Sequence, residues 1–272
     1  MNFYQAIILG VLQGATEFLP ISSSGHLVIV PWLLDWPSPG LVFDTTVHWG
    51  TLAAVVLYFW RDILDLAIAW FASVRTRNLR DDPNRLLAWL IIVGTIPAAL
   101  AGYLFQDAFE SLFARPTWAA TFLLITGVIL FGSEKLGRRQ RELANLSWWD
   151  TVLIGIAQAV AIAPGISRSG STIGMGLVRN LGREAATRFS FLLMAPIVFG
   201  AGLLKLLDLL GAGGGSTAGL SLIVGFFAAA ATGYACIALL LRYVRRHSLT
   251  VFALYCWLAG ALTLLVAVAG WR

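Results

Sequence analysis

The chain has 272 residues, of which 58% are hydrophobic and only 12% are charged, and its mean hydropathy is +0.80. A soluble domain carries about a quarter charged residues, so this composition excludes a soluble globular protein and indicates one embedded in lipid. The net charge of +5 does not imply nucleic acid as a partner, because the basic residues lie in short segments between apolar runs, where they report membrane orientation.

The first predicted element, residues 1–34, is an interrupted helix. Its apolar sequence reaches Leu19-Pro20 and continues with a Ser/Gly run at 22–25. Proline removes a backbone donor and glycine loosens a helix, so we expect two short helices joined by a polar elbow near 18–27. Such a re-entrant loop enters and leaves the membrane on one side. Three stretches long enough to cross a bilayer follow: 45–60, 86–106 and 117–133.

The second half of the chain repeats this plan. With an offset of 145 residues, segment 155–171 aligns with segment 10–26 and matches it at six positions. The break now falls at Pro164-Gly165, so we expect a second elbow near 163–172. Three further spans are predicted: 186–207, 218–241 and 250–270.

The predicted fold class is therefore an all-α polytopic membrane protein with two inverted-topology repeats in a single integral membrane domain, 1–272. Because three spans follow each re-entrant loop, the second repeat must lie upside down relative to the first. The first repeat covers 1–133 and the second 148–272, with 134–147 as a cytoplasmic linker. Both termini then lie outside, and the positive-inside rule is satisfied by four cytoplasmic basic segments: 74–85, 134–147, 179–188 and 242–247.

Each repeat carries one charge near its break. Glu17 is the only charged side chain between residues 1 and 34, and Arg168 is the only one between 151 and 178. A lone ion in a bilayer costs at least about 2.5–3.5 kcal/mol, so we expect the two to pair where the elbows meet. A buried salt bridge that only joins the repeats is one interpretation, and Ser/Gly elbows are by themselves ordinary packing features. The many hydroxyl groups around the pair favour a functional site instead.

The donors around Arg168 suit an oxyanion. Its guanidinium group can form two parallel hydrogen bonds to phosphate oxygens. If residues 165–172 begin a helix, their backbone amides and the positive end of the helix dipole also attract an anion. We therefore expect a phosphate or diphosphate to bind through this set: Ser22, Gly165, Ser167, Arg168, Ser169 and Thr172.

The catalytic groups are expected beside these donors. Ser23 is the predicted nucleophile, activated by His26 or by Glu17, while His26 could also be a nucleophile, an acid/base or a partner of the leaving group. Glu17 lies four residues after Gln13, so the two share a helical face and could instead hold a divalent cation. The residues leave these alternatives open.

Two other polar residues are expected to have structural roles at helix ends. His48 is predicted to hydrate or cap the end of the span that begins at 45. Asp150 is predicted to be an N-terminal helix charge next to interfacial tryptophans.

Four segments carry a family resemblance. QGATE (13–17), LPISSSGHL (19–27), PGISRSGST (164–172) and FSFLLMAP (189–196) together resemble the bacterial undecaprenyl-diphosphate phosphatase family linked to bacitracin resistance. The likeness spans nearly the whole chain, and its two signatures, [E/Q]xxxE and PGxSRSxxT, are specific in combination.

The resemblance implies an enzyme of the bacterial cytoplasmic membrane, and the outward-opening first elbow predicts a pocket open to the periplasm. Its lipid substrate would be undecaprenyl diphosphate, hydrolysed to undecaprenyl phosphate and inorganic phosphate to recycle the carrier for peptidoglycan synthesis. Members are similar in needing Mg²⁺ or Ca²⁺. Gln13 stands where other members have Glu, which puts a two-carboxylate metal site in doubt. The positions that match the signatures are Gln13, Glu17, Ser22, Ser23, His26, Pro164, Gly165, Ser167, Arg168, Ser169 and Thr172.

Two other functions compete with hydrolysis. Inverted repeats with broken helices are also the architecture of secondary transporters, so a transporter or polyprenyl-phosphate flippase is the main alternative. A purely structural membrane protein is the third. Membrane lipids are expected partners in every case, and a homodimer is compatible with each.

Overall fold

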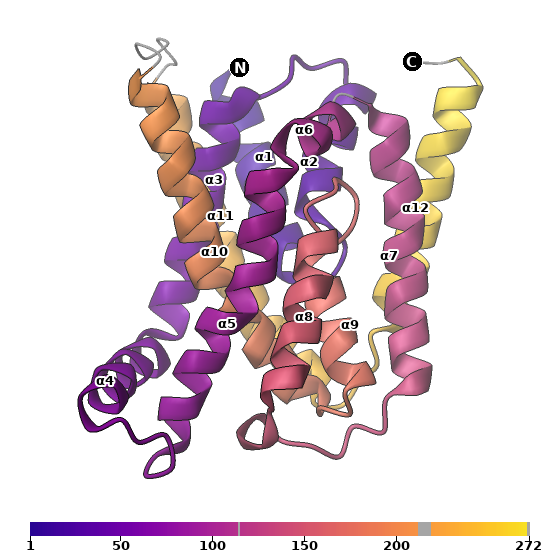
Figure 1. Cartoon of the computed structure of the whole chain (residues 1–272). Coiled ribbons are helices and arrows are strands. Elements are labelled where there is room, and N and C mark those ends of the chain that lie inside the picture. The colour runs from indigo at the N-terminus through magenta and orange to yellow at the C-terminus, as the bar shows by residue number, and fades with distance from the viewer. Residues whose placement is uncertain (114, 212–218, 271–272) are drawn as a thin grey trace.

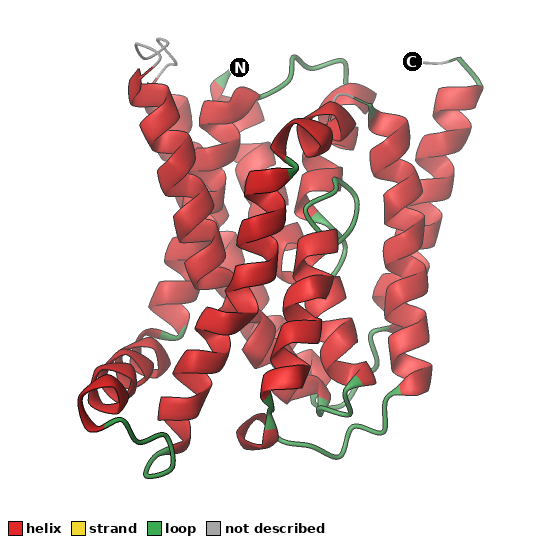
Figure 2. Cartoon of the chain, in the orientation of Figure 1, coloured by secondary structure: helices red, strands yellow, loops and turns green. Residues whose placement is uncertain are grey.

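The computed structural model describes residues 1–113, 115–211 and 219–270. In this part of the chain, helices are joined by loops, and one isolated β-bridge links Arg141 with Leu181 (Figures 1 and 2). The all-α prediction is confirmed. The helices are α1 (Phe3–Phe18), α2 (Ser23–Leu33), α3 (Gly40–Tyr58), α4 (Trp60–Thr76), α5 (Pro83–Leu104), α6 (Gln106–Phe113), α7 (Pro116–Leu136), the 3₁₀ helix η1 (Leu143–Asn145), α8 (Trp148–Val160), α9 (Arg168–Val178), α10 (Arg183–Gly211), α11 (Gly219–Val244) and α12 (Thr250–Val268).

Six of these helices are long and apolar enough to cross a membrane: α3, α5, α7, α10, α11 and α12. They correspond to the six predicted spans, so the multi-pass prediction is confirmed. The span predicted from residue 45 begins earlier, at Gly40. Its first turns contain Asp44, a charge that lies outside the apolar stretch from which the span was predicted.

Four shorter helices form two re-entrant pairs, α1 with α2 and α8 with α9. Their lengths of 11 to 16 residues are too short for a bilayer core of about 30 Å. In Figure 1, α1 runs in from the end of the molecule that carries both termini, whereas α8 runs in from the opposite end. Both interruptions fall within the predicted elbows, since α2 begins at Ser23 and α9 at Arg168.

The same cap begins the second helix of each pair. The Ser22 hydroxyl accepts from the Gly25 amide at 3.2 Å, and the Ser167 hydroxyl accepts from the Gly170 amide at 3.0 Å. A serine cap accepts a hydrogen bond from one of the unpaired backbone amides at the start of a helix. This bond matters most inside a membrane, where no water can accept it. The two elbows therefore start their second helices by the same chemistry.

Close backbone packing ties the two halves together. Helix α1 lies along α11, α8 along α5, and α7 along α12. A Cβ on Gly10 would lie 2.6 Å from the Gly225 carbonyl oxygen, and one on Gly155 would lie 2.5 Å from that of Gly94. Small residues at such crossings are typical of membrane helices, where van der Waals contact drives association.

The amphipathic helix α4 was not predicted. It follows α3 directly and lies at the end of the molecule opposite the termini (Figure 1). Charged residues such as Arg61 and Asp62 interrupt its apolar sequence, so hydropathy alone registers no span there. Its exposed Leu64, Ile68 and Phe71 share a face, as in helices that lie along a membrane surface.

Candidate active site

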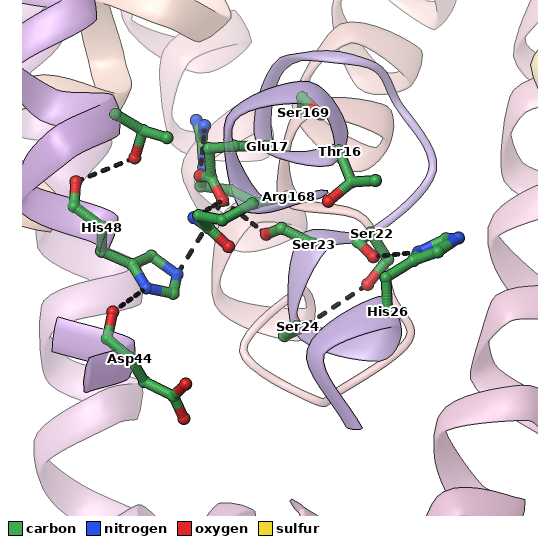
Figure 3. A network of polar contacts seen from close by, with 12 residues as sticks. Thr16, Glu17, Ser22, Ser23, Ser24, His26, Asp44, His48, Arg168 and Ser169 are labelled. Atoms are coloured by element: carbon green, nitrogen blue, oxygen red, sulfur yellow. Dashed lines mark hydrogen bonds and ion pairs between the residues drawn. The ribbon is translucent and has the colours of Figure 1, made fainter. Parts of the chain in front are cut away.

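The two solitary charges of the re-entrant segments meet. Glu17 lies in the last turn of α1 and Arg168 in the first turn of α9, and Arg168 Nη2 donates to Glu17 Oε1 at 3.1 Å (Figure 3). Both side chains are largely buried, with exposures of 6% and 15%. The structure therefore confirms the expected pairing across 151 residues of sequence.

The other carboxylate oxygen of Glu17 contacts the elbow serine. Ser23 Oγ donates to Glu17 Oε2 at 2.5 Å, and the amide nitrogen of Gln13 donates to the same oxygen at 3.0 Å. Ser23 is the first residue of α2, so the chain reversal after Leu19 turns its hydroxyl back toward the end of α1. A buried carboxylate in contact with a hydroxyl group is the arrangement that a general base needs toward a nucleophile.

His26 faces away from this pair. Its Nδ1 lies 2.7 Å from the Ser22 carbonyl oxygen and must donate to it, so Nε2 accepts from the Tyr255 hydroxyl, also at 2.7 Å. In Figure 3 the ring points away from Glu17 and Arg168. Both ring nitrogens are engaged. The geometry therefore places Glu17, and not His26, against the Ser23 hydroxyl.

Most of the hydroxyls expected to bind diphosphate hold the elbows in place. Ser167 caps α9 and its amide donates to Thr126 Oγ1, whose hydroxyl in turn donates to the Gly165 carbonyl oxygen. Ser169 Oγ contacts the Leu19 carbonyl oxygen at 3.4 Å, and Thr172 Oγ1 donates to the Arg168 carbonyl oxygen at 2.8 Å.

Arg168 keeps capacity for an anion. Its Nη1 donates to the Ser190 carbonyl oxygen at 3.3 Å and its Nη2 to Glu17, while Nε is buried without a hydrogen-bond partner among the described residues. The first amides of α9 also lack helical acceptors. Among the predicted anion ligands, Arg168 is thus the one whose side chain offers an unused buried donor at the elbow.

A cavity of about 520 Å³ adjoins the site. It is bordered at the site by Ser24 and His48, and it reaches Trp36 and Ser38 in the loop between α2 and α3. That loop lies at the end of the molecule that carries both termini (Figure 1). Beyond Ser24 its α2 wall is mainly apolar, while α3 contributes charged and polar groups and α10 contributes Lys205.

The chain matches the family model of bacitracin resistance protein BacA over residues 6–262. It belongs to this family. Relatives named undecaprenyl-diphosphatase are similar over nearly their whole length. The one from Thermomicrobium roseum is 44% identical over 98% of each chain, that from Pelobacter propionicus 46% over 99% of each, and that from Moorella thermoacetica 44% over 98% of each.

The prediction that His48 only caps a helix end is wrong for this BacA family member. His48 lies two turns inside α3, because that helix begins at Gly40, and its Nε2 is 3.9 Å from Glu17 Oε2 (Figure 3). Its Nδ1 donates to the Asp44 carbonyl oxygen at 2.7 Å. The i, i+4 pair of Asp44 and His48 on one face of an apolar helix was the signal that could have revealed it.

Two further residues near the site were missed by the sequence analysis. The carbonyl oxygen of Ser190 in α10 accepts a hydrogen bond from Arg168, and the Ser190 hydroxyl lies 2.6 Å from Thr172 Oγ1. The hydroxyl of Tyr255 in α12 forms the hydrogen bond to the second ring nitrogen of His26, Nε2. Ser190 lies within the FSFLLMAP segment that contributed to the family resemblance, whereas nothing in the sequence around Tyr255 marks it.

Asp150 is an N-terminal helix charge, as predicted, and it lies outside the six spans at the start of α8, at the end of the molecule opposite the loop between α2 and α3 (Figure 1). It forms a capping box with Ser147 and accepts from Arg141 Nη2 at 2.7 Å and Arg179 Nε at 2.6 Å. Burial opposes its ionisation, but the hydrogen bonds from Arg141, Ser147 and Arg179 outweigh it and hold the pKa of Asp150 well below its usual range.

Proposed function

We propose that this chain hydrolyses undecaprenyl diphosphate to undecaprenyl phosphate and inorganic phosphate. The observation that carries the proposal is the contact of Ser23 Oγ with Glu17 Oε2 at 2.5 Å, with Arg168 on the other carboxylate oxygen. A nucleophile, a base and an anion ligand thus converge within a membrane domain, where a polyprenyl tail can remain in lipid. The names of the relatives support this substrate.

The geometry supports a two-step reaction. Ser23 Oγ attacks the terminal phosphorus, its proton passes to Glu17, and the bond to the bridging oxygen breaks to release undecaprenyl phosphate. Water then attacks the phosphoserine, and the bond from phosphorus to Ser23 Oγ breaks. Both protons of the water leave on the inorganic phosphate, and the serine oxygen takes back the proton held by Glu17. Arg168 and the first amides of α9 stabilise the negative charge that builds up on the phosphoryl oxygens.

His26 acts in this proposal as a positioning residue. Ser22 has a left-handed backbone with φ of +70°, which is strained for a residue other than glycine. Its carbonyl oxygen accepts from both the backbone amide and Nδ1 of His26. These bonds hold the strained residue directly before Ser23, so His26 orients the nucleophile through Ser22.

The site is proposed to open to the outside of the bacterial cytoplasmic membrane. The loop between α2 and α3, which the cavity reaches, lies with both termini at one end of the molecule, and the loops that contain 74–85, 134–147 and 242–247 lie at the other (Figure 1). Their basic residues place that second end in the cytoplasm by the positive-inside rule. Hydrolysis on the outer side would return the lipid carrier for peptidoglycan synthesis and support bacitracin resistance.

The described residues do not fit a protein-held cation. Glu17 is the one carboxylate at the elbows, and Arg168 and Ser23 each engage one of its oxygens. A guanidinium 3.1 Å away also opposes a second positive charge there. No group of three or more His, Cys, Asp or Glu that could hold a metal occurs within the described ranges. The Gln13 Oε1 atom is an available protein oxygen, so the Mg²⁺ or Ca²⁺ that the resemblance implies would depend mainly on oxygens of the diphosphate.

Lipid transport is a second candidate function, favoured by the approach of the two re-entrant pairs from opposite ends of the molecule (Figure 1). Movement of labelled polyprenyl phosphate across sealed liposomes, without phosphate release from the diphosphate, would favour it over hydrolysis.

The test of hydrolysis uses the purified full-length protein in detergent with undecaprenyl diphosphate, and measures inorganic phosphate. We expect Glu17→Gln to lower kcat by about 10² to 10⁴, since a positioned base contributes that much, and Ser23→Ala to lower it to background. The matched control is Ser111→Ala, which removes an exposed hydroxyl bonded only within α6. A folded Ser23→Ala protein with the wild-type rate would exclude the proposed nucleophile. Light scattering on the same sample tests for a homodimer.

A further inference from the structure

His48 carries an uncommitted ring nitrogen at the site. The chain has three histidines. Both nitrogens of His26 are bonded to other groups, and His247 lies exposed beyond the end of α11. His48 Nδ1 donates to the Asp44 carbonyl oxygen, while the contact recorded for Nε2 among the described residues is Glu17 Oε2 at 3.9 Å, too long for a hydrogen bond.

The position of His48 connects the reacting groups with the cavity. Its side chain is 31% exposed, it lines the cavity of about 520 Å³, and Glu17 lies on its other side. The bond from Nδ1 to Asp44 fixes the ring so that Nε2 points toward Glu17 (Figure 3). A substrate phosphate between Ser23 and Arg168 would lie within reach of this nitrogen.

Lys205 extends the same polar wall. It comes from α10 and lines the cavity together with Asp44, Thr45 and His48. The opposite wall is formed by α2; beyond Ser24 it is mainly apolar and contains Leu27, Val28 and Trp32. The cavity is thus divided along its length, with His48, Lys205 and the carboxylate of Asp44 on one side and a mainly apolar surface on the other. A phosphate joined to a prenyl chain has this same division.

We propose that His48 is a substrate-binding residue that donates from Nε2 to a nonbridging oxygen of the diphosphate, and that Lys205 guides the released inorganic phosphate toward the cavity mouth. The proposal rests on the hydrolysis proposed above. As imidazolium, His48 donates from both ring nitrogens. Together with Arg168 it places nitrogen atoms from α3 and α9 near the two carboxylate oxygens of Glu17.

The alternative role for His48 is that of a general base for the attacking water. The two roles make opposite predictions for a glutamine at this position. A glutamine amide reaches about as far as Nε2 and can donate a hydrogen bond, but it cannot take up a proton at neutral pH. His48→Gln therefore separates a donor from a base.

The experiment compares His48→Gln and His48→Ala with wild type in the phosphate-release assay, with the exposed His247→Ala as matched control. We expect His48→Ala to lower kcat/KM on the order of 10- to 100-fold, as for the loss of a hydrogen bond to a charged group. His48→Gln should recover to within about 3-fold of wild type. A glutamine variant as impaired as the alanine variant, or an alanine variant with wild-type kcat/KM, overturns the proposal.

Inorganic phosphate is the probe for the second part. Product inhibition of the wild type by phosphate is compared with that of Lys205→Gln and of Lys135→Gln, a lysine at the far end of α7. We expect a several-fold weaker inhibition for Lys205→Gln alone, and equal inhibition of all three proteins excludes the exit path. A wild type that releases no phosphate overturns the proposed function itself, which distinguishes that failure from a failure of this inference.

Discussion

Glu17 can remain charged inside the membrane domain because donors from three helices converge on it. Arg168 of α9 engages one carboxylate oxygen, and Gln13 of α1 and Ser23 of α2 engage the other. A buried ion pair by itself adds little stability, because desolvation offsets the attraction. The arrangement is therefore better explained by chemistry: the oxygen that receives Ser23 is the one that would take its proton.

At the same scale, Tyr255→Phe should affect catalysis without touching the reacting groups. It removes the donor to His26 Nε2 and leaves the ring stacking, so His26 and Ser22 lose a restraint. We expect a loss of stability of about 1 kcal/mol and a decrease in kcat of several-fold, with KM nearly unchanged. Phosphate release and thermal unfolding measure the two effects.

Tyr103→Phe is the matched control, because Tyr103 is 79% exposed at the end of α5. If Tyr255→Phe lowers stability but keeps the wild-type kcat, Tyr255 serves the fold alone and the positioning role of His26 loses its support.

At the scale of elements, the second elbow depends on a residue without a side chain. Gly165 has a left-handed backbone with φ of +99°, and a Cβ there would lie 2.1 Å from the Ala119 carbonyl oxygen. Its own carbonyl oxygen accepts from Thr126. Gly165 was predicted as a diphosphate ligand, and the structure shows it packed against α7. Its position lets the chain turn so that α9 begins beside α1.

Gly165→Ala should therefore destabilise the protein by more than about 1 kcal/mol, because the strain of the backbone and the clash add together. Gly132→Ala in α7 provides the comparison: a Cβ there meets no atom within 4 Å, and alanine favours a helix. Thermal unfolding in detergent should show a lower Tm for Gly165→Ala only. Equal Tm values for the two variants would argue against the close approach of Gly165 to α7.

At the scale of the whole molecule, we infer that the two halves are inverted repeats. Helices α2 and α9 are both 11 residues long, begin at positions 145 apart and carry the same serine cap. The pair α1/α2 and the pair α8/α9 enter from opposite ends (Figure 1). A duplication of this kind brings one charge from each copy to a shared elbow region, where neither copy alone would hold a balanced pair.

At the end of the molecule opposite the cavity, ion pairs between buried carboxylates and arginines connect neighbouring segments. Asp150 joins Arg141 of the linker to Arg179 after α9, and Glu134 joins Arg183 and Arg139. These contacts fasten the linker and the start of α10 to the second re-entrant pair.

Asp150→Asn should lower stability by about 1–3 kcal/mol at neutral pH, since it weakens hydrogen bonds from two arginines. The folded pKa of Asp150 is depressed, so its stabilisation is present above the ordinary pKa near 4 and is lost as the pH falls toward the folded value. The Tm difference between wild type and variant should accordingly shrink below about pH 4. A difference that does not change with pH would show that the charge of Asp150 contributes nothing.

The sequence by itself determined the membrane class, the six spans, both elbows and the pairing of Glu17 with Arg168. These follow from short-range physics: apolar length, proline and glycine breaks, and the cost of a solitary charge in lipid. Each can be read from neighbouring residues without knowing which helices touch.

Only the tertiary structure decided which polar groups face one another. His26 is close in sequence to Ser23 but turns toward Tyr255, and His48, which was set aside, points at Glu17. The rotation of a helix about its axis is set by packing against neighbours such as α11 and α12, which are distant in sequence. Helical periodicity says which residues share a face, and contact between helices decides what that face meets.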